Sequence, residues 1–167
     1  MTPNDERDPG AVRAATEDEL DALAGVWHDA WHEAHAALVA PELTRLRTRE
    51  SFVPRLRRMT PRLRVAGPLG APLGLCIIHD DELEHLFVAA AARGTGVAAA
   101  LLDDGERRLA ASGVATAWLA CAIGNERAAR FYEKRGWSRA GTMVNVAETE
   151  QGGFPLEVWR YEKRVGG

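Results

Sequence analysis

The chain has 167 residues, of which 46% are hydrophobic and 27% are charged, a composition that indicates one globular domain and excludes a disordered or fibrous protein. Its net charge of -3 at pH 7 excludes a general attraction to nucleic acid. The longest apolar run, residues 86–92, is much shorter than the roughly 20 residues that span a bilayer, so no membrane association is expected.

The two ends of the chain differ from its middle. Residues 1–10 are polar and contain two prolines but no apolar stretch, which predicts a flexible arm and not a signal peptide. Residues 11–163 are expected to fold as one domain, followed by a short tail over 164–167. Cys76 and Cys121 both lie in apolar segments, where buried, reduced thiols are usual. A cytoplasmic protein is therefore expected.

The first part of the domain is predicted to hold a strand and two helices. A weak strand precedes Thr16, and Thr16 followed by Glu19 is a capping-box pattern that begins a helix running to about Leu38. Pro41 suits the first turn of a second helix, and Pro54 allows a break before it.

The second helix lies in a locally basic segment. Between positions 45 and 64 one acid, Glu50, opposes eight arginines. They are Arg45, Arg47, Arg49, Arg55, Arg57, Arg58, Arg62 and Arg64. The simplest interpretation is a solvated helix face, and the alternative is attraction of an anionic acceptor or of cofactor phosphates.

The second part of the domain alternates strands and helices. Glycines and prolines over residues 67–72 predict a hairpin turn, Gly113 and Gly136 mark the ends of two amphipathic helices, and Asn125 is placed to cap the second one. The predicted strands are residues 62–66, 73–79, 83–88, 114–123, 137–146 and 156–161, and the predicted helices are residues 96–112 and 126–135. With a polar loop over 147–155, this order indicates one α/β domain.

A glycine run joins the strand that ends at Val88 to the alanine-rich helix. The run is Arg93, Gly94, Thr95, Gly96, Val97 and Ala98. Glycine lets backbone N–H groups approach an anion closely, and the first turn of the helix adds unpaired donors and the positive end of its dipole. The run therefore predicts a phosphate-binding site.

Two kinds of phosphate-binding motif are excluded by neighbouring residues. A Walker loop requires a lysine after its last glycine, and none follows here. The dinucleotide pattern GxGxxG/A is matched by Gly94, Gly96 and Ala99, but it also requires a carboxylate about 20 positions later, at the end of the next strand. That strand ends at Ile123 and holds no acid.

The glycine run resembles the acetyl-coenzyme A signature of the GNAT N-acetyltransferases, in which Gln or Arg is followed by xxGx and then Gly or Ala. The matching residues are Arg93, Gly96 and Ala98. Residues 125–137 resemble a second motif of that family, NxxAxxFYxKxGF. Because the two motifs occur in the family's order, the chain is identified as similar to that family over roughly residues 11–163.

The resemblance implies a fold. It implies a single α/β (α+β) GNAT domain with a mixed central sheet of about seven strands flanked by about four helices. Splayed strands of that sheet form the acetyl-coenzyme A cleft in the family. One departure is the turn at Ala89 and Ala90, where many members carry a proline.

The resemblance also implies which residues bind the cofactor, acetyl-coenzyme A. Its pantetheine arm would pair with the end of the strand like an added strand, and its pyrophosphate would accept N–H groups of the glycine run. The implied residues are Phe87, Val88, Arg93, Gly94, Thr95, Gly96, Val97, Ala98 and Asn125. For Asn125, a simple helix cap is the alternative.

Acetylation of an amine needs a base, a donor for the developing oxyanion and an acid for the departing thiolate. Tyr132 matches the family's general acid, with a core tyrosine as the alternative. Glu82 precedes Arg93 by eleven residues, where histone-acetylating relatives carry a catalytic glutamate, and it is the first candidate for the base, with an exposed turn carboxylate as the alternative. Ideal alternation puts Glu84 on the face of Glu82 and His85 on the opposite face, although a bulge, frequent in relatives, would change this.

The first helix is implied to border the acceptor pocket. Its aromatic and imidazole side chains on adjoining turns are His28, Trp31, His32 and His35, and any of the three histidines could relay the amine proton. The predicted pocket residues are Trp31, His32, His35, Glu84 and His85. No metal is expected, because residues 32–35 are one residue short of HExxH and no third ligand is apparent.

The predicted function is transfer of an acetyl group from acetyl-coenzyme A to a primary amine of a small molecule or peptide, by direct attack. The alternative is a non-catalytic acyl-coenzyme A sensor of the same fold. A nucleic-acid binder that uses the arginines is disfavoured by the net acidic chain. The expected partner is therefore the amine acceptor, with neither nucleic acid nor membrane, and the protein is expected to be a monomer or a homodimer.

Overall fold

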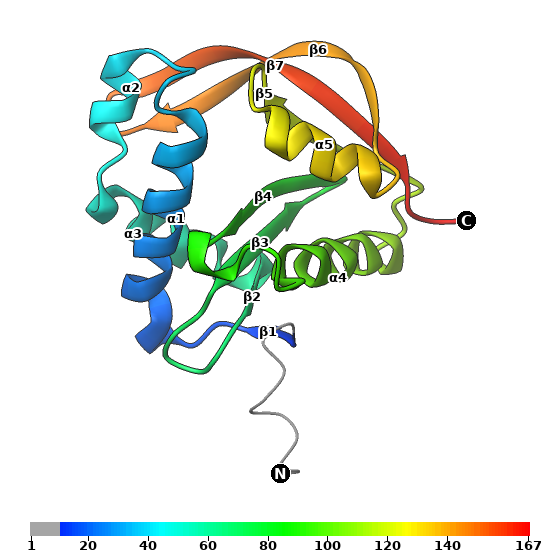
Figure 1. Ribbon diagram of the computed structural model, residues 1–167, viewed down its shortest axis with the longest axis horizontal. Helices are drawn as coiled ribbons and strands as arrows, with labels where there is room; N and C mark the ends of the chain where they lie inside the picture. The colour runs from blue at the N-terminus through cyan, green and yellow to red at the C-terminus, as the bar shows by residue number, and fades with distance from the viewer. Residues whose placement is uncertain (1–10) are drawn as a thin grey trace.

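Seven strands form one mixed sheet in the computed structural model, which describes residues 11–167. Their order is β1-β2-β3-β4-β5-β7-β6 (Figure 1), and every neighbouring pair is antiparallel except β4 and β5. The strands are β1 (Val12–Ala14), β2 (Leu63–Ala66), β3 (Gly74–His79), β4 (Glu82–Val88), β5 (Thr116–Ala122), β6 (Ser138–Thr149) and β7 (Gly152–Arg164). The predicted mixed sheet is confirmed, and the predicted flexible arm, residues 1–10, lies outside the described residues.

Five α-helices accompany the sheet in the described part of the chain, one more than predicted. They are α1 (Leu20–His35), α2 (Pro41–Leu46), α3 (Arg49–Met59), α4 (Val97–Ala111) and α5 (Glu126–Lys134). The helix break occurs at Arg47 and Thr48, whereas Pro54 lies inside α3, so the break expected before Pro54 is wrong. Thr48 has extended backbone angles and its hydroxyl accepts a 3.2 Å hydrogen bond from the Ser51 N–H, which begins a new helix there.

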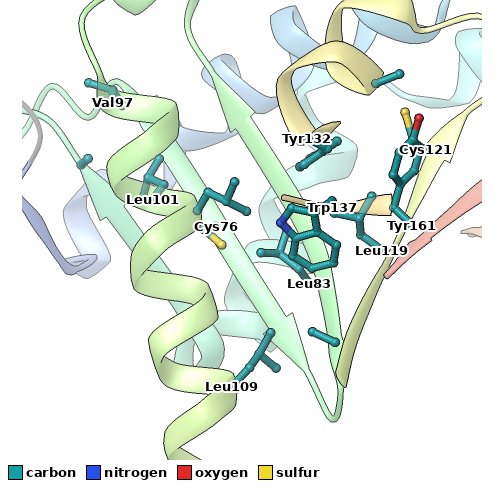
Figure 2. Packing of buried hydrophobic residues seen from close by; sticks show 14 of the residues in the cluster. Cys76, Leu83, Val97, Leu101, Leu109, Leu119, Cys121, Tyr132, Trp137 and Tyr161 are labelled. Carbon is teal, nitrogen blue, oxygen red and sulfur yellow. The ribbon is translucent and has the colours of Figure 1, made fainter. Parts of the chain in front are cut away.

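The helices cover both faces of the sheet (Figure 1). On one face, α1 and α3 bury a cluster that includes Trp27, Phe52 and Ile77. On the other, α4 and α5 bury a cluster that includes Leu101 and Tyr132, drawn in Figure 2. The central strand β4 is therefore packed from both sides.

No helix within residues 11–167 combines the length and apolar character needed to cross a membrane.

The two cysteines are free and buried, as predicted. Burial raises the pKa of the Cys76 thiol to about 12 and that of Cys121 to about 11. A nucleophilic cysteine must be a thiolate at working pH, so neither residue is suited to nucleophilic chemistry.

The two last strands are longer than predicted. The expected polar loop over 147–155 is wrong, because β6 and β7 pair as far as Thr149 and Gly152. The residues of that segment are not all solvated: Ala147 and Phe154 are partly buried against the cluster beneath α1 and α3. Packing against a distant helix layer therefore extends the hairpin across the molecule.

Strands β4 and β5 are the parallel pair, and they separate along their length. Their register joins Glu82 to Trp118, and no later position of the two strands pairs within the described residues. β5 continues instead alongside β7, from Thr116 to Ala122. The sheet is thus open between β4 and β5 beyond Glu82, as expected for splayed strands.

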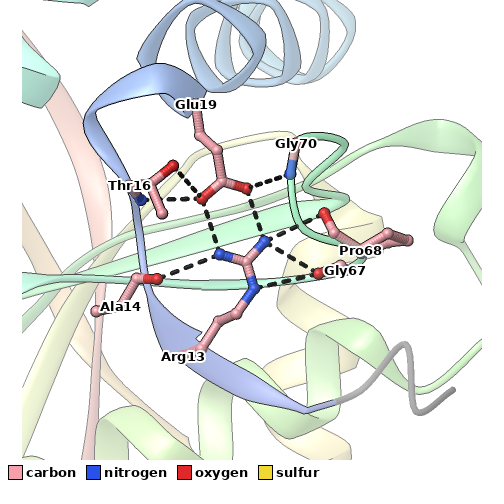
Figure 3. Close-up of polar contacts among 7 residues, drawn as sticks. All are labelled: Arg13, Ala14, Thr16, Glu19, Gly67, Pro68 and Gly70. Atoms are coloured by element: carbon pink, nitrogen blue, oxygen red, sulfur yellow. Dashed lines mark hydrogen bonds and ion pairs between the residues drawn. The ribbon is translucent and has the colours of Figure 1, made fainter. Parts of the chain in front are cut away.

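A partly buried ion pair joins the elements at the start of the domain (Figure 3). The Arg13 guanidinium donates to both carboxylate oxygens of Glu19, at 2.8 and 2.7 Å, and to the carbonyl of Gly67. Glu19 also accepts the N–H groups of Thr16 and Gly70, at 2.9 and 3.1 Å. The predicted capping-box contact from Glu19 to Thr16 is therefore present, and it joins β1, the start of α1 and the turn between β2 and β3.

Candidate active site

The opening between β4 and β5 leads into a cavity of about 1130 Å³. Its walls come from α1, the α2–α3 segment, β4, β5, α5, the β6–β7 hairpin and the glycine run. The predicted site residues that line it are Trp31, His35, Glu82, Glu84, His85, Phe87, Val88, Arg93, Gly94, Gly96, Ala98, Asn125 and Tyr132. This volume exceeds that of most single small-molecule pockets, which leaves room for a cofactor and a second ligand.

Four residues of the glycine run, Arg93, Gly94, Gly96 and Ala98, line the cavity. Gly94 and Gly96 have φ angles of 76° and 88°, the left-handed region that favours glycine. Within the described residues, the N–H groups of Gly94, Gly96, Val97 and Ala98 donate no hydrogen bond. Four free amides at the start of a 15-residue helix suit an anion such as a pyrophosphate.

Three predicted residues lie outside the cavity lining. The Val97 side chain is fully buried in the core, and the Thr95 hydroxyl donates to the Ala92 carbonyl. Val97 can therefore contribute to anion binding only through its backbone. His32 Nε2 lies 2.6 Å from the carbonyl oxygen of Arg47, so this imidazole holds the α2–α3 connection against α1.

A carboxylate that the sequence analysis did not single out pairs with the glycine run. Glu33 of α1 contacts the guanidinium of Arg93 and, at 3.5 Å, that of Arg127 at the start of α5. All three residues line the cavity. The pairing, with Arg93 first, lowers the pKa of Glu33, so the carboxylate stays ionised. No local pattern identifies it, because its partners lie on other elements.

A β-bulge in β4 places three candidate residues, Glu82, Glu84 and His85, on one face of the strand. Ile77 of β3 pairs with His85, but the next residue, Ile78, pairs with Leu83, so Glu84 is the extra residue of β4. The His85 ring then faces α1, with its centroid 4.8 Å from that of Trp27. The ideal alternation that put His85 opposite Glu82 is therefore wrong.

The two glutamates of this face differ in ionisation. Burial, with the neighbouring charges of Glu84 and Asp81, raises the pKa of Glu82 to about 7. Burial also disfavours ionisation of Glu84, but the contacts with His85 and Arg62 outweigh it and lower the pKa of Glu84 to about 2. Glu82 can thus exchange a proton near neutral pH, whereas Glu84 remains an anion.

Glu82 and Glu84, together with His79, form one possible set of metal ligands. Ligand atoms of His79, Glu82 and Glu84 lie within 4.8 Å of one another. However, Arg62 Nη1 lies 3.0 Å from Glu84 Oε2 and also donates to the Ile78 carbonyl. The guanidinium already supplies the positive charge at this carboxylate, so we interpret the group as an ion-pair network.

The histidines of α1 have different surroundings. His35 lines the cavity, and its Nδ1 lies 3.2 Å from the Trp31 carbonyl oxygen. Burial lowers the pKa of His35 to about 4, so its ring is neutral near pH 7. His28 instead pairs with Asp29 at 2.9 Å. Among the α1 histidines, only His35 lines the cavity.

Tyr132 lies on α5 opposite β4. Its ring packs against Trp137 and Tyr161 in the cluster of Figure 2, and its hydroxyl makes no hydrogen bond within residues 11–167. Burial raises its pKa above the ordinary tyrosine range, so it is a protonated donor at neutral pH. Asn125 Oδ1 accepts the Ala128 N–H at 3.3 Å, as a helix cap does, and Asn125 also lines the cavity.

The basic segment proves to be divided between surface and cavity. Arg47, Arg55 and Arg58 line the cavity, and Arg47 is only 4% exposed. The interpretation as a solvated face is therefore wrong for Arg47, while it holds for Arg57, which is exposed and pairs with Glu17 at 3.6 Å. The sequence signal for the cavity arginines was the shortage of opposing acids.

Comparisons with known proteins give one family and one fold. The model of the acetyltransferase (GNAT) family matches residues 12–137, and a search of curated proteins finds no match. A GCN5-related N-acetyltransferase from Rhodopseudomonas palustris is 20% identical with a TM-score of 0.72, over 93% of this chain and 95% of that one. The PaiA N-acetyltransferase from Thermoplasma acidophilum, in complex with coenzyme A, is 18% identical with a TM-score of 0.65, over 92% and 98%.

A third similar structure is a putative acetyltransferase from Salmonella typhimurium with its cofactor acetyl-CoA, which is 15% identical with a TM-score of 0.69, over 93% of each chain. These neighbours share the fold of the chain. The cofactor predicted from the motifs, acetyl-coenzyme A, is thereby confirmed at the level of the family. Because the family model covers most of the sequence, from β1 to the end of the second motif, the chain belongs to the acetyltransferase (GNAT) family.

Proposed function

We propose that the protein transfers the acetyl group of acetyl-coenzyme A to a primary amine of a small molecule or peptide, by direct attack of the amine. The observation that carries the proposal is a single cavity lined by the free amides of the glycine run, by Glu82 and by Tyr132. It brings together an anion-binding end, a proton acceptor with a pKa of about 7 and a protonated phenol. These are the groups that acetyl transfer requires.

The cofactor supplies the acetyl thioester. Phe87 and Val88 present the edge of β4 where β5 has separated from it, which suits strand-like pairing with the pantetheine arm. The free N–H groups of residues 94 and 96–98 suit the pyrophosphate. Arg93 and Arg127, both at the cavity, add positive charge beside them.

The proton steps fall to two residues on opposite walls. Glu82 accepts the proton that the amine loses as the carbon–nitrogen bond forms, directly or through one water molecule. Tyr132 donates its proton to the sulfur as the carbon–sulfur bond breaks. The raised pKa of the Tyr132 hydroxyl and the near-neutral pKa of Glu82 both suit these roles.

A thiol-release assay with acetyl-coenzyme A and a panel of amines tests the proposal. We expect thiol release with at least one amine, and a fall of about 10²- to 10⁴-fold in turnover for Tyr132→Phe while coenzyme A still raises the melting temperature. Unchanged turnover in Tyr132→Phe would remove the acid from the proposal. Stabilisation by coenzyme A without thiol release from any amine would instead identify the sensor alternative.

A further inference from the structure

One wall of the cavity carries three buried hydrogen-bond donors without acceptors. Within residues 11–167, Trp27 Nε1, Arg47 Nε and Arg55 Nη1 are buried and make no hydrogen bond. All three residues line the cavity, Trp27 is fully buried, and Arg47 is 4% exposed. Buried donors in proteins nearly always have a partner, and these three belong to residues that line the cavity, where a ligand rich in acceptor oxygens would supply one.

The two guanidinium groups are held in place by aromatic rings and backbone. The Arg55 guanidinium carbon lies 4.5 Å from the centroid of the Trp27 ring and 5.5 Å from that of Phe52. Arg47 Nη1 donates to the carbonyl oxygen of Glu148 on β6, at 2.7 Å. Both groups are thus positioned before any ligand binds, which reduces the entropy lost on binding.

Neither arginine is neutralised by the protein. In the described part of the chain, no carboxylate lies within 4.0 Å of Arg47 or Arg55. Two of the cavity's acids are paired elsewhere, Glu84 with Arg62 and Glu33 with Arg93, and Glu148 acts on Arg47 through charge without forming an ion pair. Burial lowers the pKa of Arg55 to about 9, an unfavourable effect that a bound anion would reverse.

The phosphates of the cofactor are not the anion that these donors require. Arg47 and Arg55 contact residues of α1, α3 and β6, and none of these contacts reaches the glycine run. The Trp27 ring, on which Arg55 stacks, has its centroid 4.8 Å from that of the His85 ring on β4. The donors of α1 and α3 therefore lie beside the part of β4 that carries His85, several residues before the glycine run.

We propose that the acceptor is a small amine that also carries a carboxylate, as an amino acid does, and that Trp27, Arg47 and Arg55 bind this carboxylate while the amine faces Glu82. The inference rests on the proposed function and narrows its substrate class. A planar guanidinium offers two parallel donors to a carboxylate. Polyamines and aminoglycoside-like acceptors are disfavoured, because their cations would lie beside the two arginines.

The test compares matched acceptors that differ only in the carboxylate. Free amino acids and the corresponding amino acid amides are assayed for thiol release with the wild-type protein, Arg55→Gln, Arg47→Gln and the control Arg57→Gln. We expect the wild type to favour the best free amino acid over its amide by at least about tenfold in kcat/KM. Arg55→Gln and Arg47→Gln should reduce this ratio mainly through KM, with KM for acetyl-coenzyme A unchanged.

A control variant and separate outcomes distinguish failure of the inference from failure of the proposed function. Arg57 lies on α3 with Arg55 but outside the cavity lining, so Arg57→Gln should keep the wild-type ratio. Equal use of acids and amides by the wild type, or an unchanged ratio in both cavity variants, would overturn the inference and leave acetyl transfer intact. Absence of thiol release with every amine would overturn the proposed function and the inference with it. If Arg55→Gln does not fold, the acid-to-amide ratio of kcat/KM in the wild type and in Arg47→Gln still tests the inference.

Discussion

Glu82 and Glu84 share one face of β4, yet their surroundings move their carboxyl pKa values in opposite directions, to about 7 and to about 2. For Glu82, burial is the main cause, and the neighbouring acids add to it. For Glu84, the contacts with His85 and Arg62 outweigh the effect of burial. One face therefore offers a proton acceptor and a permanent anion side by side, a common arrangement of acid–base sites.

The first prediction concerns the pH dependence of turnover. Since Glu82 must be deprotonated to act as base, kcat/KM should rise with pH through an apparent pKa near 7. Glu82→Gln should remove this limb and lower kcat by about 10²- to 10⁴-fold. Rate measurements between pH 5 and 9 at saturating acetyl-coenzyme A would check it. A limb near 7 that persists in Glu82→Gln would assign the proton to another group.

The second prediction concerns Glu84. The charge of Glu84 is one cause of the raised pKa of Glu82, so Glu84→Gln should move the limb, the rise of kcat/KM with pH, to lower pH. Asp81→Asn should move it in the same direction by less, because Asp81 contributes less than Glu84. The same pH profiles measure both shifts. An unmoved limb in Glu84→Gln would contradict the electrostatic coupling between the two carboxylates.

The third prediction concerns the carboxylate beside the glycine run. Glu33 competes with phosphate for Arg93 and Arg127, so Glu33→Gln should tighten binding of coenzyme A, most clearly at low salt. Calorimetric titration at two salt concentrations would measure the change. Asp29→Asn, one turn earlier on α1 and paired with His28, is the matched control and should leave binding unchanged. Weaker binding in Glu33→Gln would show that the pair positions Arg93 for the phosphates.

The fourth prediction concerns stability. Glu19 is 1% exposed and accepts five hydrogen bonds from Arg13, Thr16 and Gly70 through its two oxygens, so Glu19→Gln should lower the free energy of unfolding by about 1–3 kcal/mol. Denaturant titration would measure it. Glu17→Gln, on the same turn but 72% exposed, should change the free energy by less than about 0.5 kcal/mol.

The same carboxylate predicts acid sensitivity. The hydrogen bonds from Arg13, with those from Thr16 and Gly70, lower the pKa of Glu19 to about 2 in the folded protein, against about 4.3 in an unfolded chain. A lowered pKa means that the stabilisation is present above the unfolded value and is lost as pH falls from about 4.3 toward 2. The difference in stability between wild type and Glu19→Gln should therefore shrink over this range. A stability difference that stays constant over this pH range would contradict the lowered pKa of Glu19.

Much of the fold could be predicted because its signals are local. The Asn125 cap and the ends at Gly113 and Gly136 each act within one helical turn, and the structure has them where the sequence placed them. The prediction of secondary structure was wrong where contacts with distant parts of the chain determine the local structure. The segment 147–155 pairs as strand because the layer of α1 and α3 packs against it, and Pro54 is accommodated inside α3.

By itself, the sequence determined the order of the strands, the glycine run and the motif over residues 125–137, because these depend on contacts within one turn or along one strand. Only the tertiary structure decided that His85 shares a face with Glu82, since the bulge arises in pairing with β3. Only the tertiary structure also decided that Arg55 stacks on Trp27 and that Arg47 is buried beside β6. Register, burial and pKa depend on atoms that folding brings together from distant parts of the chain, and no local pattern encodes them.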